Sequence, residues 1–310
     1  MPSQLPHGIV TALVTPFQDD ERIDFSAWQR IIDFQIESGV DGLLATGGQG
    51  EFYSLDAEER IVALRFCRQA VGGRVPLYGN VGAVSTRETI SLAQKAEAEG
   101  IDYAVVITPY YLQPSPAELV QHYCDICRSV RLPVLAYNIP ERTGVELTFA
   151  SLRRIAQLCP NFIGLKDSSG KLDHMADLAA IGEKRPFSVF IGRDHLILEA
   201  LHRGAAGAVT ACGNVAPRAF VELYKAYREG RQDDAARLQT IVKPLREAFA
   251  LHTFPSVMKA AMEMIGFPAG PCRRPVGPMP PDARDRLLTV LEVLRDLGYV
   301  DTLASKKGAD

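Results

Sequence analysis

The sequence predicts an α/β protein, a (β/α)8 TIM barrel with a C-terminal helical extension. Eight short apolar runs alternate with longer segments whose apolar residues recur at helical spacing. The runs are mostly continuous, as expected of parallel strands with helices on one face and a packed interior on the other. A strand-and-helix unit repeated eight times forms a barrel of typically about 250 residues. This chain of 310 residues is long enough for such a barrel and an extension.

The predicted strands follow one another at intervals that leave room for a helix. They cover residues 10–14, 42–45, 76–80, 103–108, 133–137, 162–166, 187–191 and 207–211. Seven of the intervals contain a helical pattern. In the first, an apolar stripe is formed by Phe25, Trp28, Ile31, Ile32 and Ile36.

Helix boundary signals agree with this order. Ser54 is the expected cap of a helix whose first turn, residues 56–59, is acidic. Pro116 occupies the first position of another predicted helix, after Ser115. Glycines follow the expected helix ends at Gly39, Gly72, Gly100, Gly182 and Gly204.

The eight units account for residues 1–229, and the remainder, 230–310, has no strand signal. Helical patterns occur there at residues 235–242, 245–251, 256–265 and 282–297. We interpret this region as an extension packed on the barrel, so that the chain forms a single structural unit. A doubly wound open sheet would also alternate strands and helices, but it does not fit a count of eight.

Charge and apolar content limit the classes of function. The 34 Lys and Arg residues against 37 Asp and Glu give a net charge of −3 with no basic block, so no nucleic acid partner is expected. No apolar stretch approaches the roughly 20 residues that span a bilayer, so no membrane partner is expected. Residues 1–7 lack the features of a secretory signal. We therefore expect a cytoplasmic protein whose six cysteines are reduced thiols.

In this fold the active site lies at the carboxyl ends of the strands, where Lys166 ends the sixth. Period two puts Phe162, Gly164 and Lys166 on one face. If that face points into the barrel, the missing side chain of Gly164 leaves room beside the lysine stem. Burial then favours the neutral amine that imine formation requires. The alternative is a lysine that extends its ammonium to solvent at the rim.

Other residues at the strand ends suit the same chemistry. Tyr137, which ends the preceding strand, can pass protons to and from a carbinolamine, or can merely pack. Arg142 suits a substrate carboxylate, or alternatively forms a surface ion pair with a neighbour such as Glu141. The glycine-rich turn at residues 47–50 exposes backbone N–H groups that suit a carboxylate or phosphate, or serves only as a tight turn.

Other motifs indicate no chemistry. The Cys124-x-x-Cys127 pair lies within the helix expected over residues 116–130 and has no second pair, so core thiols are favoured over zinc ligands. The histidines form no clustered ligand set, and no metal is indicated. A G-x-S-x-G elbow, the mark of one class of hydrolase, does not occur.

Four motifs occur in register over nearly the whole chain. They are Gly47-x-x-Gly50-Glu51, Thr108-Pro109-Tyr110-Tyr111, Tyr137-Asn138-Ile139-Pro140-x-Arg142-Thr143-Gly144 and Gly164-Leu165-Lys166-Asp167-Ser168-Ser169-Gly170. Together they resemble the dihydrodipicolinate synthase/N-acetylneuraminate lyase family. The resemblance implies a class I lyase that binds pyruvate or another 2-oxo acid as a Schiff base and needs no cofactor beyond that covalent imine.

The resemblance also implies roles for individual residues. By match to the family motifs, Lys166 is the imine-forming lysine and Tyr137 the proton-transferring tyrosine. Gly48 and Gln49 stand where the pyruvate carboxylate is held, and Val209 stands where a backbone carbonyl contacts it.

A further implication concerns assembly. Tyr111 stands where the family places a tyrosine that crosses into a neighbouring subunit's site. The family mostly forms tetramers built from tight dimers, so the resemblance implies a homotetramer.

The identity of the substrate is less constrained. The segment around Arg142 is similar to the synthases, whose arginine holds a second substrate carboxylate, whereas Gly48 replaces a hydroxyl residue of the family's proton relay. Residues 270–275 resemble 4-hydroxy-2-oxoglutarate aldolases, and residues 50–52 recur in 2-keto-3-deoxy sugar acid aldolases and dehydratases. A non-catalytic 2-oxo acid-binding member and a metal-dependent barrel aldolase are the remaining alternatives.

Overall fold

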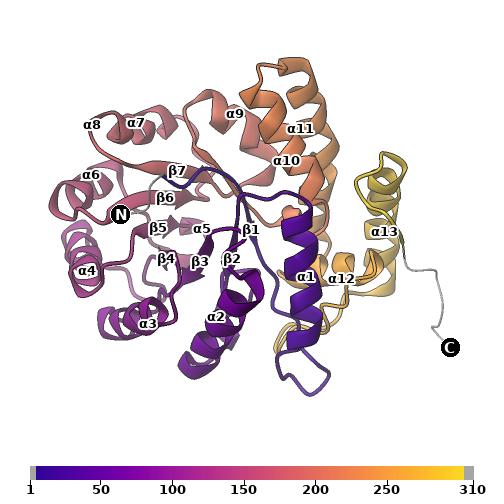
Figure 1. The fold of residues 1–310 in the computed structure, drawn as a ribbon, viewed down its shortest axis with the longest axis horizontal. Helices are drawn as coiled ribbons and strands as arrows, with labels where there is room; N and C mark the ends of the chain where they lie inside the picture. The colour runs from indigo at the N-terminus through magenta and orange to yellow at the C-terminus, as the bar shows by residue number, and fades with distance from the viewer. Residues whose placement is uncertain (1–4, 304–310) are drawn as a thin grey trace.

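The structure, a computed structural model, describes residues 5–303. Its parallel strands are hydrogen-bonded in chain order, and the last pairs with the first to close a barrel surrounded by helices (Figure 1). The strands are β1 (Gly8–Ala12), β2 (Gly42–Ala45), β3 (Leu77–Asn80), β4 (Tyr103–Ile107), β5 (Val134–Asn138), β6 (Phe162–Asp167), β7 (Ser188–Ile191) and β8 (Gly207–Thr210). The predicted fold class is confirmed.

The first strand was predicted in the wrong place, because β1 covers residues 8–12 rather than 10–14. The other strands lie within one residue of their predicted bounds. Gly8 begins β1 and pairs with Gly207 of β8, and its amide donates to Ala206 O at 3.0 Å. A strand that begins at a glycine extends beyond its apolar run, so the apolar pattern alone could not locate its start.

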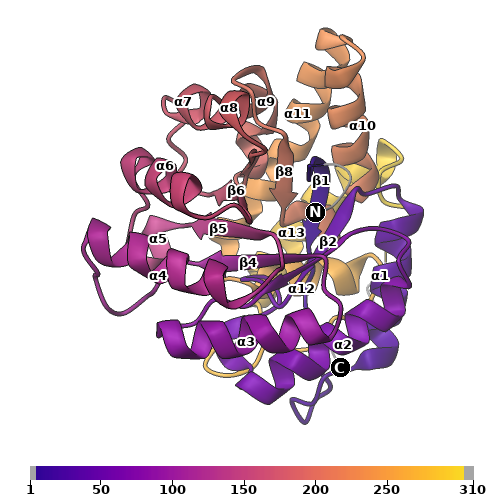
Figure 2. The ribbon, with the colours of Figure 1, turned by 60° about the vertical axis from the view of Figure 1, so that its left-hand side comes forward.

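Helices cover the outside of the barrel, as Figures 1 and 2 show. They are α1 (Phe25–Glu37), α2 (Ala57–Val71), α3 (Thr86–Ala98), α4 (Pro116–Ser129), α5 (Pro140–Thr143), α6 (Phe149–Leu158), α7 (Met175–Ala179), α8 (Ile181–Lys184), α9 (Ile197–His202) and α10 (Pro217–Arg228).

Two predicted helix boundaries are wrong. The cap of α2 is Asp56, not Ser54, which belongs to the short 3₁₀ helix η1 (Phe52–Ser54). Asp56 accepts from the amides of Glu58 and Glu59, and Glu59 accepts from the Asp56 amide in return, so the free donors of the first turn are satisfied. Gly182 lies inside the short helix α8 rather than after a helix end.

Two apolar clusters form the core. The larger one lies between the strands and the surrounding helices and includes the buried Trp28. The smaller one fills the barrel and includes Tyr78, whose ring stacks on Tyr103 with centroids 4.6 Å apart. Because the interior is filled by side chains, ligands can reach this fold only at its ends.

The C-terminal extension consists of α11 (Gln232–Glu247), the 3₁₀ helix η4 (Ala248–Leu251), α12 (Ser256–Met264) and α13 (Pro281–Asp296). Helix α11 runs alongside α10 in Figures 1 and 2. The sequence predicts two helices where α11 is continuous through Pro244. Burial of Val242 and Leu245 on either side of the proline holds the helix together despite the lost hydrogen bond. Residues 1–4 and 304–310, which the sequence analysis placed in the barrel and the extension, lie outside the described residues.

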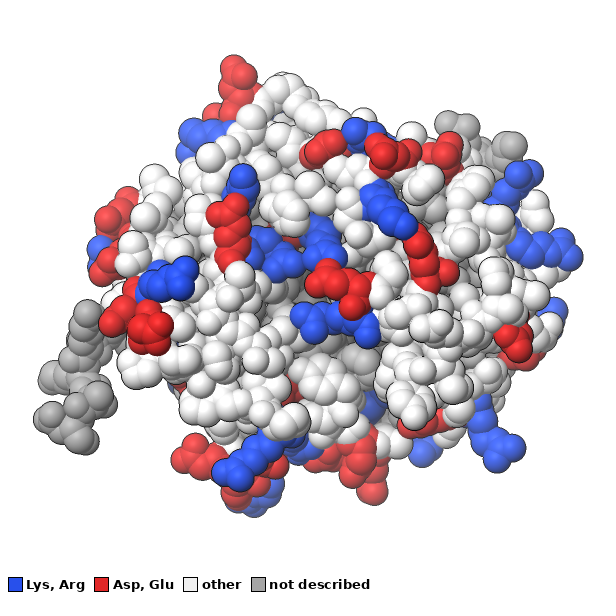
Figure 3. Space-filling view, turned by 180° about the vertical axis from the view of Figure 1, so that it is seen from behind, with Lys and Arg blue, Asp and Glu red and all other residues white. Residues whose placement is uncertain are grey.

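Charged side chains of both signs are interspersed over the face of the molecule in Figure 3. Among residues 5–303, no helix has the length and apolar character that crossing a membrane requires.

We expect Gly207→Ala to destabilise the protein strongly, since a Cβ at this position would lie 2.0 Å from Gly8 O at the seam between β8 and β1. Overpacking of this kind costs about 1–3 kcal/mol or more. Urea unfolding measures the effect. Gly277→Ala is the matched control, because a Cβ there meets nothing within 4 Å. Equal unfolding midpoints for the two variants would show that the seam tolerates a methyl group.

Candidate active site

A cavity of about 420 Å³ opens at the carboxyl ends of the strands. Its size lies within the roughly 300–1,000 Å³ typical of small-molecule sites. Of the seven residues that the sequence analysis selected, Tyr111 does not line this cavity. The six that do are Gly48, Gln49, Tyr137, Arg142, Lys166 and Val209.

Lys166 and Tyr137 are neighbours across two paired strands. The register of β5 and β6 places them directly opposite each other, and Lys166 Nζ lies 4.0 Å from the centroid of the Tyr137 ring. Lys166 is only 5% exposed. Among residues 5–303 it forms no ion pair, so its amine faces an aromatic surface rather than a carboxylate.

The strand that carries Lys166 departs from strict alternation. The register of β6 against β5 shifts by one residue near its start, so that Ile163 points into the barrel while Phe162 packs against the outer helices. The prediction that Phe162 and Lys166 share a face is therefore wrong. The room beside the lysine stem also comes from a different glycine. A Cβ on Gly192 would lie 3.2 Å from Lys166 Cε, whereas one on Gly164 would meet Ser188 O and Leu135.

The glycine-rich turn presents an unsatisfied polar side chain. Gln49 is 3% exposed and lines the cavity, yet neither its amide oxygen nor its amide nitrogen has a hydrogen-bond partner among the described residues. Buried polar groups in proteins are normally paired. The amide of Gln49 is therefore placed to bind a polar ligand.

Space at the other positions of the turn differs. A Cβ on Gly50 would lie 3.0 Å from Thr15 Oγ1 and 3.1 Å from Leu13 O, so a side chain at this position would require these neighbours to move by a few tenths of an ångström. A Cβ on Gly48 would be in ordinary contact with Phe254, at 3.5 Å. The absence of a hydroxyl group at Gly48 is therefore not forced by lack of space.

The guanidinium of Arg142 is held over the cavity by the aromatic ring of Phe254 rather than by a carboxylate. It lies on the short helix α5, with its guanidinium 4.2 Å from the centroid of the Phe254 ring. The alternative pairing with Glu141 is absent from the described structure, because Glu141 pairs with Arg193. That hydrogen-bonded pair lowers the pKa of Glu141. Arg142 is thus available to a ligand.

Tyr111 is directed away from this chain's own cavity. It is 93% exposed and has a left-handed backbone, with φ 73°. The preceding residue, Tyr110, lines the cavity and meets Phe52 edge-on with ring centroids 6.0 Å apart. The expected role of Tyr111 in a neighbouring subunit remains a prediction.

The model of the dihydrodipicolinate synthetase family matches residues 5–294 of this chain. The chain belongs to this family. A probable 2-dehydro-3-deoxy-D-pentonate aldolase of Escherichia coli (strain K12) is 37% identical over 288 residues, covering 92% of this chain and 96% of the relative. A 4-hydroxy-tetrahydrodipicolinate synthase of Acidiphilium cryptum is 35% identical over 274 residues, covering 88% and 93%. Synthases and aldolases of the family are lyases, and so is this enzyme.

Solved structures of the family superimpose closely on this member. A prophage protein of Escherichia coli K12, solved in complex with pyruvate, has a TM-score of 0.90 and 35% identity, covering 94% of this chain and 99% of the other. The 4-hydroxy-tetrahydrodipicolinate synthase of Methylacidiphilum fumariolicum SolV has a TM-score of 0.90 and 33% identity, covering 96% and 98%.

The sequence analysis missed the wall that the extension contributes to the cavity of this family member. This wall is formed by Arg246, Phe249, Phe254, Pro275 and Val276. A search restricted to strand ends cannot reach these residues. The available signal was weak, namely the two phenylalanines Phe249 and Phe254 near a helix boundary.

The cysteine pair of α4 has a structural partner. Cys124, Cys127 and Cys159 are buried, and the sulfur atoms of Cys124 and Cys159 lie 3.3 Å apart. All six cysteines of the chain are free thiols. Within the described residues, no group of three or more His, Cys, Asp or Glu side chains is arranged to hold a metal ion.

We expect Gln49→Leu to raise the free energy of unfolding by about 1 kcal/mol, because it removes a buried amide that lacks partners. Gln35→Leu is the control. Gln35 is equally buried, but its Nε2 donates to Asn214 O at 3.0 Å, so its loss should destabilise. Chemical denaturation of both variants measures the difference. A loss of stability in Gln49→Leu would contradict the prediction.

Proposed function

We propose that this lyase acts on pyruvate or a related 2-oxo acid through an imine on Lys166. The observation that carries the proposal is the environment of this lysine, whose buried amine faces Tyr137 and forms no ion pair within the described chain. An amine kept from water and from carboxylates is available as a nucleophile. The pyruvate complex of the Escherichia coli relative supports the choice of ligand.

The proposed chemistry begins with attack of Lys166 Nζ on the C2 carbonyl. Tyr137 donates a proton to the carbinolamine oxygen and accepts one from the nitrogen, and water leaves to give the imine. The imine then withdraws electrons, so that a C–C or C–O bond further along the substrate breaks, or a C–C bond forms, through the enamine. The covalent imine supplies the electron sink, so we propose no further cofactor.

The C1 carboxylate fits the glycine-rich turn in this scheme. The amides of residues 47–50, including that of Gly48, and the side chain of Gln49 supply donors, and the Gln49 amide is the group without a partner. Val209 on β8 also lines the cavity, and its carbonyl contacts the ligand in the proposed complex. This set holds the 2-oxo acid with its carbonyl near Lys166.

The distal end of the substrate carries a second carboxylate in our proposal. Arg142 lies over Phe254, and Arg246 lies over Phe249 at 4.4 Å. Neither guanidinium forms an ion pair within residues 5–303, although both line the cavity. Two arginines that form no ion pair, in a cavity where the nearby Glu141 is already paired with Arg193, favour an anionic group there.

A specific observation supports an aldolase of hydroxylated 2-oxo acids as a second candidate beside a dihydrodipicolinate synthase-like enzyme. Gly48 has no hydroxyl group to pass a proton toward Tyr111, although a Cβ at this position would be only in ordinary contact with Phe254. The Escherichia coli relative with 37% identity is named as a sugar acid aldolase. A 4-hydroxy-2-oxoglutarate or 2-keto-3-deoxy sugar acid therefore becomes the second candidate substrate class.

The exposed Tyr111 and the free cysteines bear on the assembly and the cellular location of this enzyme. We propose a homotetramer in which Tyr111, exposed in the single chain, reaches a neighbouring subunit's site. We also propose a cytoplasmic location, which agrees with six free thiols.

Borohydride reduction in the presence of pyruvate should attach one adduct to Lys166, detected by peptide mass spectrometry. The variant Lys166→Arg should remain unlabelled, because a guanidinium does not form the imine. Lys259, the other lysine that is buried among the described side chains, serves as the internal control and should not react. An unmodified Lys166 under saturating pyruvate would overturn the proposal, and loss of activity in EDTA would instead indicate a metal-dependent aldolase.

A substrate panel with Arg142→Gln tests the second carboxylate. The panel contains 4-hydroxy-2-oxoglutarate, 2-keto-3-deoxy sugar acids, and pyruvate with aspartate semialdehyde. Truncating one partner of a charge pair costs about 2 kcal/mol or more, so KM for the preferred dicarboxylate should rise more than tenfold. Monocarboxylate substrates are the control and should change little. Pyruvate binding without turnover of any compound would identify a non-catalytic member.

A further inference from the structure

A buried ion pair lies directly behind the glycine-rich turn. Glu51 follows the turn, and its carboxylate is 2.7 Å from the ammonium of Lys259 on α12. Both side chains are almost completely buried, at 0% and 2% exposure. Lys259 Nζ also donates to Pro271 O at 2.7 Å. Neither residue lines the cavity, so the pair acts on the site only through the backbone of the turn.

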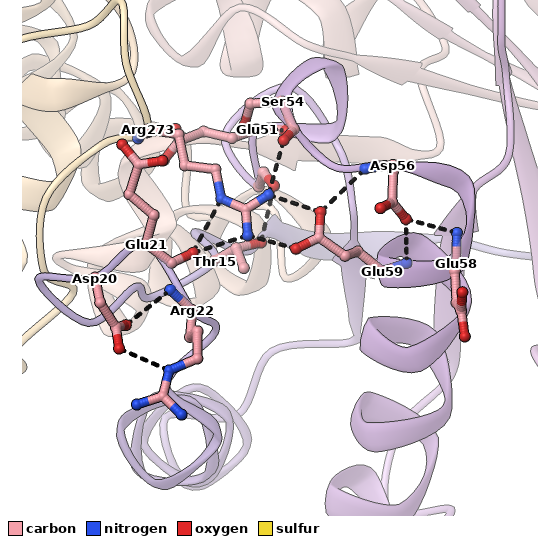
Figure 4. A network of polar contacts seen from close by, with 11 residues as sticks. Thr15, Asp20, Glu21, Arg22, Glu51, Ser54, Asp56, Glu58, Glu59 and Arg273 are labelled. Atoms are coloured by element: carbon pink, nitrogen blue, oxygen red, sulfur yellow. Dashed lines mark hydrogen bonds and ion pairs between the residues drawn. The ribbon is translucent and has the colours of Figure 1, made fainter.

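Arg273, a second cation of the extension, binds Glu51 of the same ion pair and residues that follow it in the chain. The amide of Arg273 donates to Glu51 Oε2 at 3.0 Å. Its guanidinium donates to both carboxylate oxygens of Glu59, at 2.7 and 2.5 Å, and to Ser54 O at 2.8 Å (Figure 4). Glu59 is also the residue that closes the capping box of α2. Arg273 therefore joins the extension to the segment that runs from the turn into α2.

The backbone of the turn needs such support. Thr46 and Glu51, at its two ends, have left-handed φ values of 51° and 54°, which side-chain-bearing residues rarely adopt. Conformations of this kind persist only where the surrounding structure holds them. Between these two positions lie Gly48 and Gln49, the residues that face the cavity.

We propose that Lys259 and Arg273 are positioning residues, which hold the turn at residues 47–50 in the conformation that receives the substrate carboxylate. The proposal rests on the proposed function, since it concerns the same carboxylate. It assigns the extension a part in binding the 2-oxo acid, in addition to its contribution to the cavity wall.

The experiment measures the pyruvate concentration that gives half-maximal borohydride labelling of Lys166. In Lys259→Met and in Arg273→Gln this concentration should rise by about tenfold or more, because a turn displaced by a fraction of an ångström aligns its donors poorly. The maximal extent of labelling should remain that of the wild type. Lys225→Met is the matched control, since Lys225 pairs with Glu229 on the exposed face of α10.

A double variant separates positioning from stability. Glu51→Gln combined with Lys259→Met removes both buried charges, so it should unfold at a higher temperature than Lys259→Met alone while its half-maximal concentration stays raised. Half-maximal concentrations equal to that of the wild type, in folded variants with lowered unfolding temperatures, would overturn the proposal and leave a purely structural role. Absence of labelling in the wild type would instead refute the proposed function.

Discussion

The geometry of the site depends on a pair of charges that water does not reach. Removing one partner from such a pair typically costs about 3–5 kcal/mol, because the remaining charge is stranded in a poorly polarisable interior. Folded proteins are stable by only about 5–15 kcal/mol. Removing either Glu51, which follows β2, or Lys259, on α12, would therefore lower the free energy of unfolding by a large part of its total. This contact joins the barrel to its extension beside the cavity.

Two buried lysines in this chain show how surroundings decide the behaviour of one residue type. Lys259 has a carboxylate, a backbone carbonyl and the ring of Phe17 around its ammonium. Burial lowers the pKa of Lys259, and the charge of Glu51 opposes that shift. Lys166 has only the ring of Tyr137 and the space left by Gly192. The first arrangement suits a buried ion pair, and the second suits an amine that reacts.

Periodicity and strand-end position were sufficient to predict the barrel and, with the family resemblance, six of the residues that line its cavity. They were insufficient where the backbone departs from regularity, because a one-residue register shift near Ile163 moves Phe162 to the outer face. Periodicity and strand-end position also could not indicate which glycine leaves room beside the Lys166 side chain. That glycine is Gly192, which comes from a different strand end than Gly164. Contacts such as that of Phe254 with Arg142 join segments far apart in the chain and follow no local pattern.

The division of the cavity wall between barrel and extension has a consequence for how this enzyme can diversify. The groups proposed to form the imine belong to β5 and β6, whereas Arg246, Phe249, Phe254 and Val276 belong to a separate stretch near the end of the chain. Substitutions at these four positions can change the selectivity for the distal part of the substrate without altering the residues proposed to form the imine. New substrates can thus arise through mutation of a few residues of the extension, while Lys259 and Arg273 of the same stretch are retained.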